Sequence, residues 1–394
     1  MVDPVTIATA LVAAVASLFM AWAIGAGSSG STPFAPAVGA NAISVMRAGL
    51  IVGILGFAGA VLQGQSVTEA VGSELVGGVA LTAVTATVAL LIAAVLVAMG
   101  VFKGYPIATA FTVTGAVVGV GLALGGDPAW AKYRQIVTLW VLTPFVGGGI
   151  AYGTARLLRS EHVPERVLVP TLAGLVGALV ANIGFALLGP ADGTGSIAGE
   201  LARSLGADGT LGRGVATLAL AVLVGLALAA DTRRDADGAQ RRFLLALGGL
   251  VAFSAGGSQV GLAIGPLVPL LDTFQSIPIV ALLLGGGLGL LAGSWTGAPR
   301  MIKSLAQDYS SLGPRRSIAA LVPSFLIAQV AVLLGVPVSF NEIVVSAIIG
   351  SGAAVGGGEA VDARKLGVTV AAWAGSFVLA FVLGYGAVVV LPLP

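Results

Sequence analysis

Long apolar segments alternate with short polar ones along the whole of this 394-residue chain. Most of them have about the 20 residues that a helix needs to cross a bilayer. The pattern therefore predicts an all-α polytopic protein of the cell membrane, with about twelve transmembrane helices. The expected spans are residues 5–24, 45–63, 77–100, 105–126, 135–157, 167–188, 214–230, 243–258, 275–295, 317–334, 337–355 and 367–391.

The charged residues between the spans predict sidedness, because cytoplasmic loops are enriched in lysine and arginine. Segments 156–166, 231–242 and 297–316 are rich in these residues, and we expect all three in the cytoplasm. Segment 63–75 has two acids and no base, so it is expected outside, together with 189–213. Alternation of the spans then places both termini outside.

The polar stretch at residues 25–36, GAGSSGSTPFAP, interrupts the apolar pattern directly after the first span. Glycine and proline disfavour a helix interior, and serine and threonine compete for its backbone hydrogen bonds. We therefore expect a broken helix at membrane depth. Backbone polar groups exposed by such a break must be buried in protein or line a cavity.

Two motifs in the first part of the chain recur near its end at almost the same spacing. Residues 104–126 match residues 335–357 at nine of 23 positions when shifted by 231, and both segments begin with Gly-x-Pro. Residues 26–36 align with residues 256–266 at a shift of 230. The agreement of the two shifts indicates a single duplication and predicts a second broken helix at 256–266.

We therefore expect three parts in the chain. The first repeat covers residues 1–160 and the second covers 243–394, while 161–242 contributes two joining helices, an external loop and a basic linker. Five spans of the first repeat and two joining helices precede the second repeat. This odd number of crossings places the two repeats in opposite orientations. Inverted repeats with broken helices are typical of secondary transporters, whose binding sites lie near the membrane midplane.

The breaks and the Gly-x-Pro motifs carry polar side chains in otherwise apolar surroundings. Free N–H groups at a half-helix N-terminus attract anions, and hydroxyls add donors, so these clusters suggest an oxyanion site without a buried arginine. Alternatively, the hydroxyls bond back to their own helices or hold helices together. The candidate substrate-binding residues are Ser28, Ser29, Ser31, Thr32, Thr109, Ser258, Gln259, Ser339 and Asn341.

Glu342 is an acid inside an otherwise apolar run, SFNEIVVSAIIG. An ionisable side chain at membrane depth is a functional hypothesis by default. We expect Glu342 to carry a coupling proton or to bind a cation, with H⁺ and Na⁺ as the candidate ions. The alternative is a structural hydrogen bond.

Composition narrows the classes of function. The chain is 57% hydrophobic and 9% charged, against about 25% charged residues in soluble proteins. It has no cysteine and one histidine, which excludes disulfides, thiol chemistry and histidine metal clusters. We find no nucleophile–base pair or cofactor loop, so we expect neither an enzyme nor a bound cofactor or metal. A net charge of +2 is too small to suggest nucleic-acid binding.

These motifs resemble those of the inorganic phosphate transporter family, which also includes sulfate permeases. Residues 256–268, GGSQVGLAIGPLV, look like the family's first motif, and the Gly-x-Pro segments that begin at Gly104 and Gly335 look like its second. Residues 53–71 are similar to the helix and loop that follow the first motif. Residues 136–152, IVTLWVLTPFVGGGIAY, resemble the helix that closes a repeat. The resemblance covers nearly the whole chain.

The chain departs from the family at charged positions of both motifs. The family's Asn-Asp pair is replaced by Ser258 and Gln259 in the second repeat and by Ser28 and Ser29 in the first. Glu342 stands where the second motif has a histidine. The missing acids weigh against sodium coupling, and a glutamate in place of the histidine is more similar to the sulfate-type members, which resemble proton symporters.

The resemblance implies a carrier of an inorganic oxyanion that works by alternating access and symport. Phosphate is the first choice of substrate and sulfate the alternative. The family also makes a homodimer in the lipid bilayer an expectation. An anion channel and a non-transporting membrane protein stay open as rival interpretations.

Overall fold

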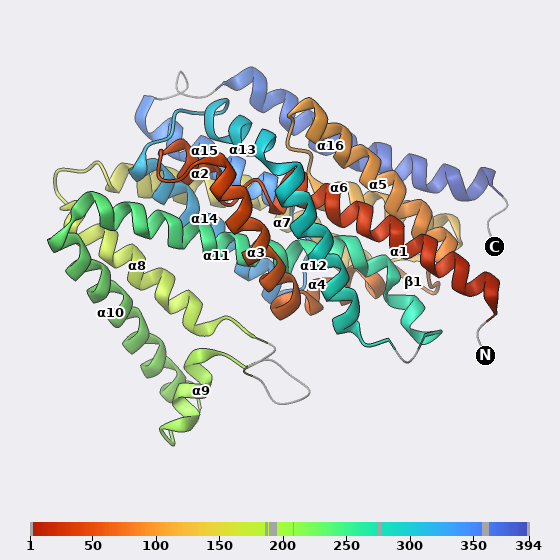
Figure 1. Ribbon diagram of the computed structural model, residues 1–394, viewed down its shortest axis with the longest axis horizontal. Helices are drawn as coiled ribbons and strands as arrows, with labels where there is room; N and C mark the ends of the chain where they lie inside the picture. Colours follow the sequence, from red (N-terminus) through yellow and green to blue (C-terminus); the bar gives the residue numbers. More distant parts are fainter. Residues whose placement is uncertain are drawn as a thin grey trace.

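Helices dominate the computed structural model (Figure 1), which describes residues 3–185, 188, 195–207, 209–274, 277–356 and 362–391. The chain begins with α1 (Pro4–Ile24), a π-helical turn (Gly25–Ser29), α2 (Ala35–Gly39), α3 (Val45–Gln63), α4 (Gln65–Ser73), β1 (Val76–Gly77), α5 (Ala83–Lys103), α6 (Thr109–Ala123), β2 (Asp127–Pro128) and α7 (Trp130–Leu157). It continues with α8 (Glu165–Asn182), α9 (Ile197–Ser204), α10 (Thr210–Arg234), α11 (Ala236–Ile264), a 3₁₀ helix (Gly265–Asp272), α12 (Ile279–Thr296), α13 (Ala298–Gln307), α14 (Pro314–Leu333), α15 (Phe340–Gly356) and α16 (Ala363–Val390). β1 and β2 pair antiparallel.

Ten helices in the described part of the chain are long and apolar enough to cross a membrane, which confirms a multi-pass membrane protein. The sequence predicted twelve spans, and two of the apolar helices are shorter, α6 with 15 residues and α15 with 17. Each follows a Gly-x-Pro segment in which Gly104 or Gly335 has a positive φ (74° and 57°). Proline does not continue a helix, so the expected spans 105–126 and 337–355 begin as extended chain.

The polar stretch after the first span loosens the helix before it ends. α1 passes directly into the π-helical turn at Gly25–Ser29, and further turns lead to the short α2. Serine and glycine allow this wider turn because neither fills the space around the backbone with a bulky side chain. The predicted departure from a regular helix at 25–36 is therefore present.

The second expected break, at 256–266, is misplaced. α11 continues without interruption through Ser258 and Gln259, and the 3₁₀ helix begins only at Gly265. The preceding glycine serves close packing instead: a Cβ on Gly256 would lie 1.8 Å from the carbonyl oxygen of Gly56 on α3. Small residues of this kind let helix backbones approach closely in a membrane.

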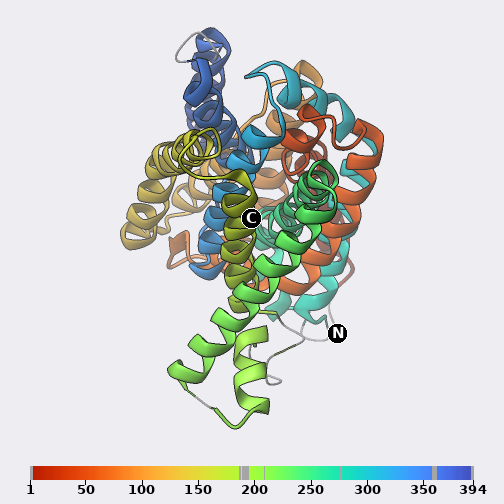
Figure 2. The same cartoon turned by 90° about the vertical axis from the view of Figure 1, so that its left-hand side faces the viewer.

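α8, α9 and α10 project from one side of the bundle (Figures 1 and 2). α8 packs along α10, and Asn182 donates a hydrogen bond to the Thr217 hydroxyl (2.9 Å) between them. The expected linker 231–242 is mostly helical, because only Asp235 separates α10 from α11. Residues 189–194 and 208 of the expected external segment lie outside the described residues.

The elements of the two expected repeats follow one another in the same order. α3 to α7 and α12 to α16 each run long, short, long, short, long, and α7 and α16 both have 28 residues. The two sets interlock, since α16 packs along α6 and α15 packs along α7. The assignment of residues 1–160 and 243–394 as inverted repeats stays a prediction, and Gly357 of the second motif lies outside the described residues.

We expect Gly256→Ala to lower the thermal unfolding temperature of the detergent-purified protein. The added methyl group must push α3 away from α11, and such overpacking costs about 1–3 kcal/mol. Gly285→Ala on α12 is the control, because no atom lies within 4 Å of a Cβ built there. Equal unfolding temperatures of the two variants would show that the close approach of α3 and α11 is unimportant for stability.

Candidate functional site

Gln259 lies at the centre of a buried hydrogen-bond network, on α11. Its Oε1 accepts hydrogen bonds from the Ser28 hydroxyl (3.1 Å) and the Thr109 hydroxyl (2.7 Å). Its Nε2 donates to the carbonyl oxygen of Val338 (2.6 Å). This one side chain therefore ties the π-helical turn and the start of α6 to the extended segment before α15.

Asn341, on the first turn of α15, makes corresponding contacts in the other direction. Its Nδ2 donates to the carbonyl oxygens of Gly27 (2.9 Å) and Ile107 (2.6 Å). We call Ser28, Thr109 and Gln259, together with Asn341, which binds the carbonyl group of the residue before Ser28, the central network. The structure brings these four predicted residues together from distant parts of the sequence, while their contact with a substrate stays a prediction.

Several polar atoms of this region are buried without a hydrogen-bond partner in the described structure. They are Ser29 Oγ, Ser258 Oγ, Asn341 Oδ1 and Glu342 Oε2. Each belongs to the central network or to a residue next to a network member in the sequence. Because buried polar groups are normally hydrogen-bonded, each of these four atoms has a free hydrogen-bonding position that a water, ion or ligand can fill.

Three predicted site residues have local partners instead. The hydroxyls of Ser31 and Thr32 donate to the carbonyl oxygen of Ser28 (3.1 and 3.0 Å), which matches the alternative interpretation of backbone-bonded hydroxyls. Ser339 Oγ accepts from the N–H of Glu342 (3.5 Å) at the start of α15. These contacts support the local backbone around the central network.

The buried region carries almost no charge. Glu342 is 2% exposed and is the only charged residue in the buried set of the described chain. The residues that the structure describes contain no group of three or more His, Asp or Glu side chains suited to a metal ion. An anion finds only neutral donors among these buried residues. Neutral donors avoid the cost of a lysine or arginine at membrane depth.

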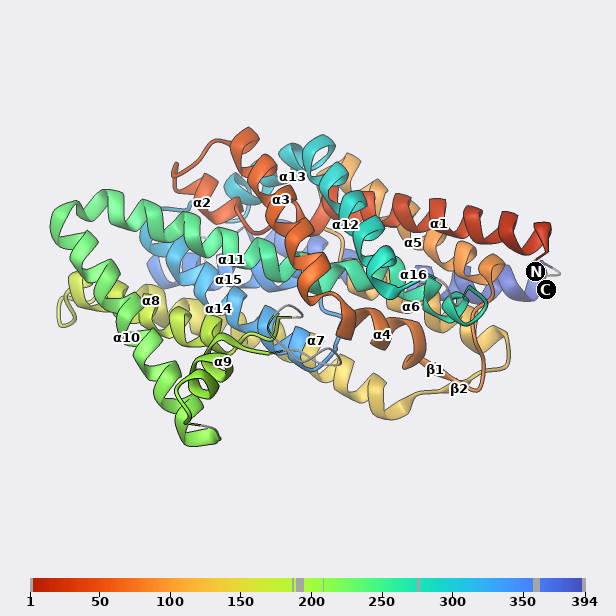
Figure 3. The ribbon, with the colours of Figure 1, turned by 60° about the horizontal axis from the view of Figure 1, so that its bottom comes forward.

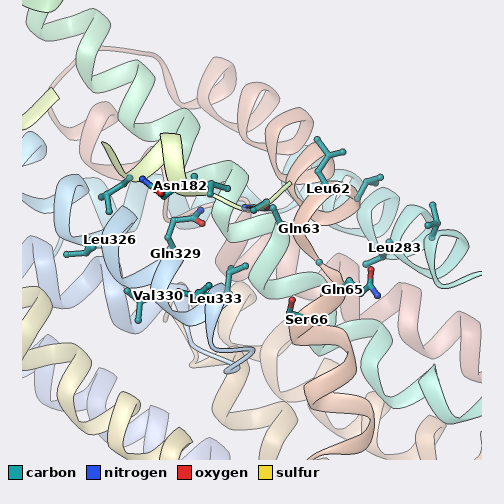
Figure 4. Close-up of a pocket in the computed structure, with 17 residues that line it drawn as sticks. Leu62, Gln63, Gln65, Ser66, Asn182, Leu283, Leu326, Gln329, Val330 and Leu333 are labelled. Carbon is teal, nitrogen blue, oxygen red and sulfur yellow. Dashed lines mark hydrogen bonds between the residues drawn. The ribbon is translucent and has the colours of Figure 1, made fainter. Parts of the chain in front are cut away.

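A pocket of about 360 Å³, which was not predicted from the sequence, lies between α3, α4, α8, α12 and α14 (Figure 4). The amides of Gln63, Asn182 and Gln329 line it from three different helices. Gln63 Nε2 donates to the carbonyl oxygen of Gly184 (3.1 Å), and Gln329 Nε2 donates to the Ser254 hydroxyl. The sequence signal that could have indicated this pocket is one amide residue near the end of each of three apolar spans.

Residues 24–384 match the model of the family described as "Phosphate transporter family". The "Putative phosphate permease" of Thermococcus kodakarensis is 27% identical over 366 residues, which cover 88% of this chain and 89% of the relative. The "Inorganic phosphate transporter 2-1, chloroplastic" of Arabidopsis thaliana is 26% identical over 403 residues, which cover 90% of this chain and 67% of the relative.

A solved structure described as "The sodium-dependent phosphate transporter" has the same fold. It superposes with a TM-score of 0.81 at 22% identity, over 97% of this chain and 98% of the other. The fold and the family are therefore those of transporters. Since the family model extends over nearly the whole sequence, the chain belongs to the phosphate transporter family.

Proposed function

We propose that this chain is a secondary active transporter that carries inorganic phosphate by symport and alternating access. The observation that carries the proposal is the central network, a buried set of neutral hydrogen-bonding groups with unpaired polar atoms beside it. The family and the names of the two relatives support phosphate as the substrate. Residues 1–160 and 243–394 act in this proposal as the inverted repeats that open to either side.

The unpaired atoms favour phosphate over sulfate. At neutral pH phosphate keeps a P–OH hydrogen, whereas sulfate has none to donate. Asn341 Oδ1 is a buried acceptor without a partner, and an amide oxygen can only accept a hydrogen bond. The unpaired hydroxyls of Ser29 and Ser258 can donate to the remaining phosphate oxygens. Sulfate is the alternative substrate.

The amide-lined pocket is the proposed route to the site from one side. Gln329 binds Ser254, which lies one helical turn before Ser258 on α11. Gln63 packs against the same stretch, since a Cβ on Gly257 would lie 2.8 Å from the Gln63 Cβ. Both contacts place the polar lining of the pocket beside the stretch of α11 that carries Ser258 and Gln259.

Glu342 is the proposed coupling group. It directly follows Asn341 in the sequence, and its Oε2 is buried without a partner. A carboxyl group can bind a proton on one side of the membrane and release it on the other. We take H⁺ as the coupling ion, with Na⁺ bound to the ionised carboxylate as the alternative.

The first prediction concerns substrate and driving ion. Proteoliposomes that contain the purified protein should accumulate radiolabelled phosphate against its gradient when the outside is more acidic, and should accumulate sulfate less. A Na⁺ gradient at equal pH tests the alternative ion. Flux that never runs uphill would indicate an anion channel, and no flux of either anion under either gradient would overturn the proposal.

A second prediction tests the central network. Gln259→Leu removes three hydrogen bonds worth about 1 kcal/mol each and should lower phosphate uptake by roughly 100-fold. Gln240→Leu is the matched control, since Gln240 is also a hydrogen-bonded glutamine on α11 but contacts Glu165 instead. Similar uptake by the two variants would place the substrate elsewhere.

A third prediction separates binding from coupling. Glu342→Gln keeps the shape of the side chain but no longer binds or releases a proton, so pH-driven phosphate accumulation should be lost while phosphate–phosphate exchange continues. Glu69→Gln, at an exposed hydrogen-bonded acid on α4, is the control. Undiminished pH-driven accumulation by Glu342→Gln would exclude it as the coupling group.

A further inference from the structure

Two extended linkers lead into the short helices that carry Thr109 and Asn341. We call Gly104–Ala108 the first linker and Gly335–Ser339 the second. The last carbonyl group of each linker, that of Ala108 or Ser339, accepts the first hydrogen bond of the helix that follows. The carbonyl groups before it need partners from elsewhere in the protein if they lie at membrane depth. The side chains that supply these partners follow a similar pattern in the two linkers.

The second linker is held by the helix that ends the first repeat. Trp140 Nε1 on α7 donates to the carbonyl oxygen of Pro337 (2.9 Å), and Lys132 Nζ on the same helix donates to that of Gly335 (3.0 Å). Lys132 also forms an ion pair with Glu74 (2.8 Å), which directly follows α4.

The first linker is held in the same way from the second repeat. Trp373 Nε1 on α16 donates to the carbonyl oxygen of Pro106 (2.7 Å). Ser304 Oγ on α13 accepts from Lys365 Nζ (3.2 Å), and its one hydrogen is shared between the carbonyl oxygen of Gly104 (3.3 Å) and Asp308 Oδ2 (2.8 Å). Lys365 in turn forms an ion pair with an acid that directly follows α13, Asp308.

The two sets of contacts use corresponding lysines and tryptophans, although Lys132 binds Gly335 directly and Lys365 reaches Gly104 through Ser304. Lys132 and Lys365 are the third residues of α7 and α16, and Trp140 and Trp373 are the eleventh. Both lysine side chains are largely buried, at 11% and 17% exposed, against 52% and 44% for their acidic partners. We call each set a clamp, and each clamp holds the Gly-x-Pro linker of the other repeat. Figure 3 shows α4 and α13, which support the two clamps, at opposite edges of the bundle.

The clamps act next to the central network. Pro337 is followed by Val338, whose carbonyl oxygen accepts from Gln259. Pro106 is followed by Ile107, whose carbonyl oxygen accepts from Asn341. In each linker the clamped proline carbonyl group therefore lies next to a carbonyl group that binds an amide of the network. A shift of either proline would move an amide of the site.

We propose that Trp140 and Trp373 are positioning residues that set the geometry of the substrate site from opposite repeats, each through the linker it clamps. This inference rests on the proposed phosphate transport by the same site. Neither tryptophan touches the central network by a hydrogen bond of its own; each indole N–H acts through a linker carbonyl. Because the clamps are equivalent, loss of either N–H should have the same kind of effect.

Trp140→Phe and Trp373→Phe test this proposal, since phenylalanine keeps an aromatic ring and removes the indole N–H together with part of the ring system. Two tryptophans outside the clamps supply matched controls that also lose an indole hydrogen bond. They are Trp22, which donates to Thr296 Oγ1 (2.8 Å), and Trp295, which donates to the carbonyl oxygen of Leu50 (3.2 Å). The full-length variants are compared in proteoliposomes for KM and maximal rate of phosphate uptake, and in detergent for thermal unfolding.

Loss of one neutral hydrogen bond that orders the site should raise KM about fivefold in each clamp variant. The controls should keep KM within about twofold at comparable unfolding temperatures. Clamp variants that unfold earlier than the controls but keep the unmodified KM would show a purely structural role and overturn the proposal. A rise in KM in the controls as large as in the clamp variants would overturn it too.

Glu74→Gln is a second test variant in case a tryptophan variant fails to fold. Glu74 is half exposed, and its replacement removes the ion pair with Lys132. It should raise KM, and an unchanged KM would contradict the clamp. If the unmodified protein carries sulfate instead of phosphate, the same KM comparison with sulfate still tests the clamps. If it carries neither anion, the proposed function fails first.

Discussion

The absence of water at membrane depth is the constraint on which the rest of this structure depends, since every backbone carbonyl there needs a donor within the protein. Two linkers leave the helical path at a Gly-x-Pro sequence and expose such carbonyl groups. The carbonyl oxygens of Ile107 and Val338 are satisfied by the amides of Asn341 and Gln259. The neighbouring proline carbonyls are satisfied by indole N–H groups from the opposite half of the chain.

The same side chains that satisfy these linkers also form the candidate site. Gln259 has an acceptor to offer Ser28 and Thr109 only because its amide group is oriented by its bond to Val338. The hydrogen bonds that satisfy the linker carbonyl groups therefore also fix the geometry of the candidate site. The groups that form these hydrogen bonds are uncharged. This suits a carrier, because a carrier must release its substrate as well as bind it.

The residues of the candidate site show which features could be predicted from the sequence and which could not. Ser28, Thr109, Gln259 and Asn341 were predicted from their polarity in apolar surroundings, and the structure brings them together. Polarity could not separate them from Ser31 and Thr32, whose hydroxyls bond to the local backbone, because both kinds of hydroxyl look alike in a sequence. The break expected at 256–266 was misplaced because glycine serves helix packing as well as helix breaking.

The sequence by itself determined that the chain is a multi-pass helical membrane protein of this family, because apolar length and the Gly-x-Pro motifs are local properties. Only the tertiary structure decided which polar groups meet, because Gln259 reaches Ser28 and Thr109 across contacts between distant segments. It also showed the amide-lined pocket and the paired clamps of Trp140 and Trp373. A hydrogen bond depends on distance and direction between two groups, and the spacing of residues along a chain specifies neither.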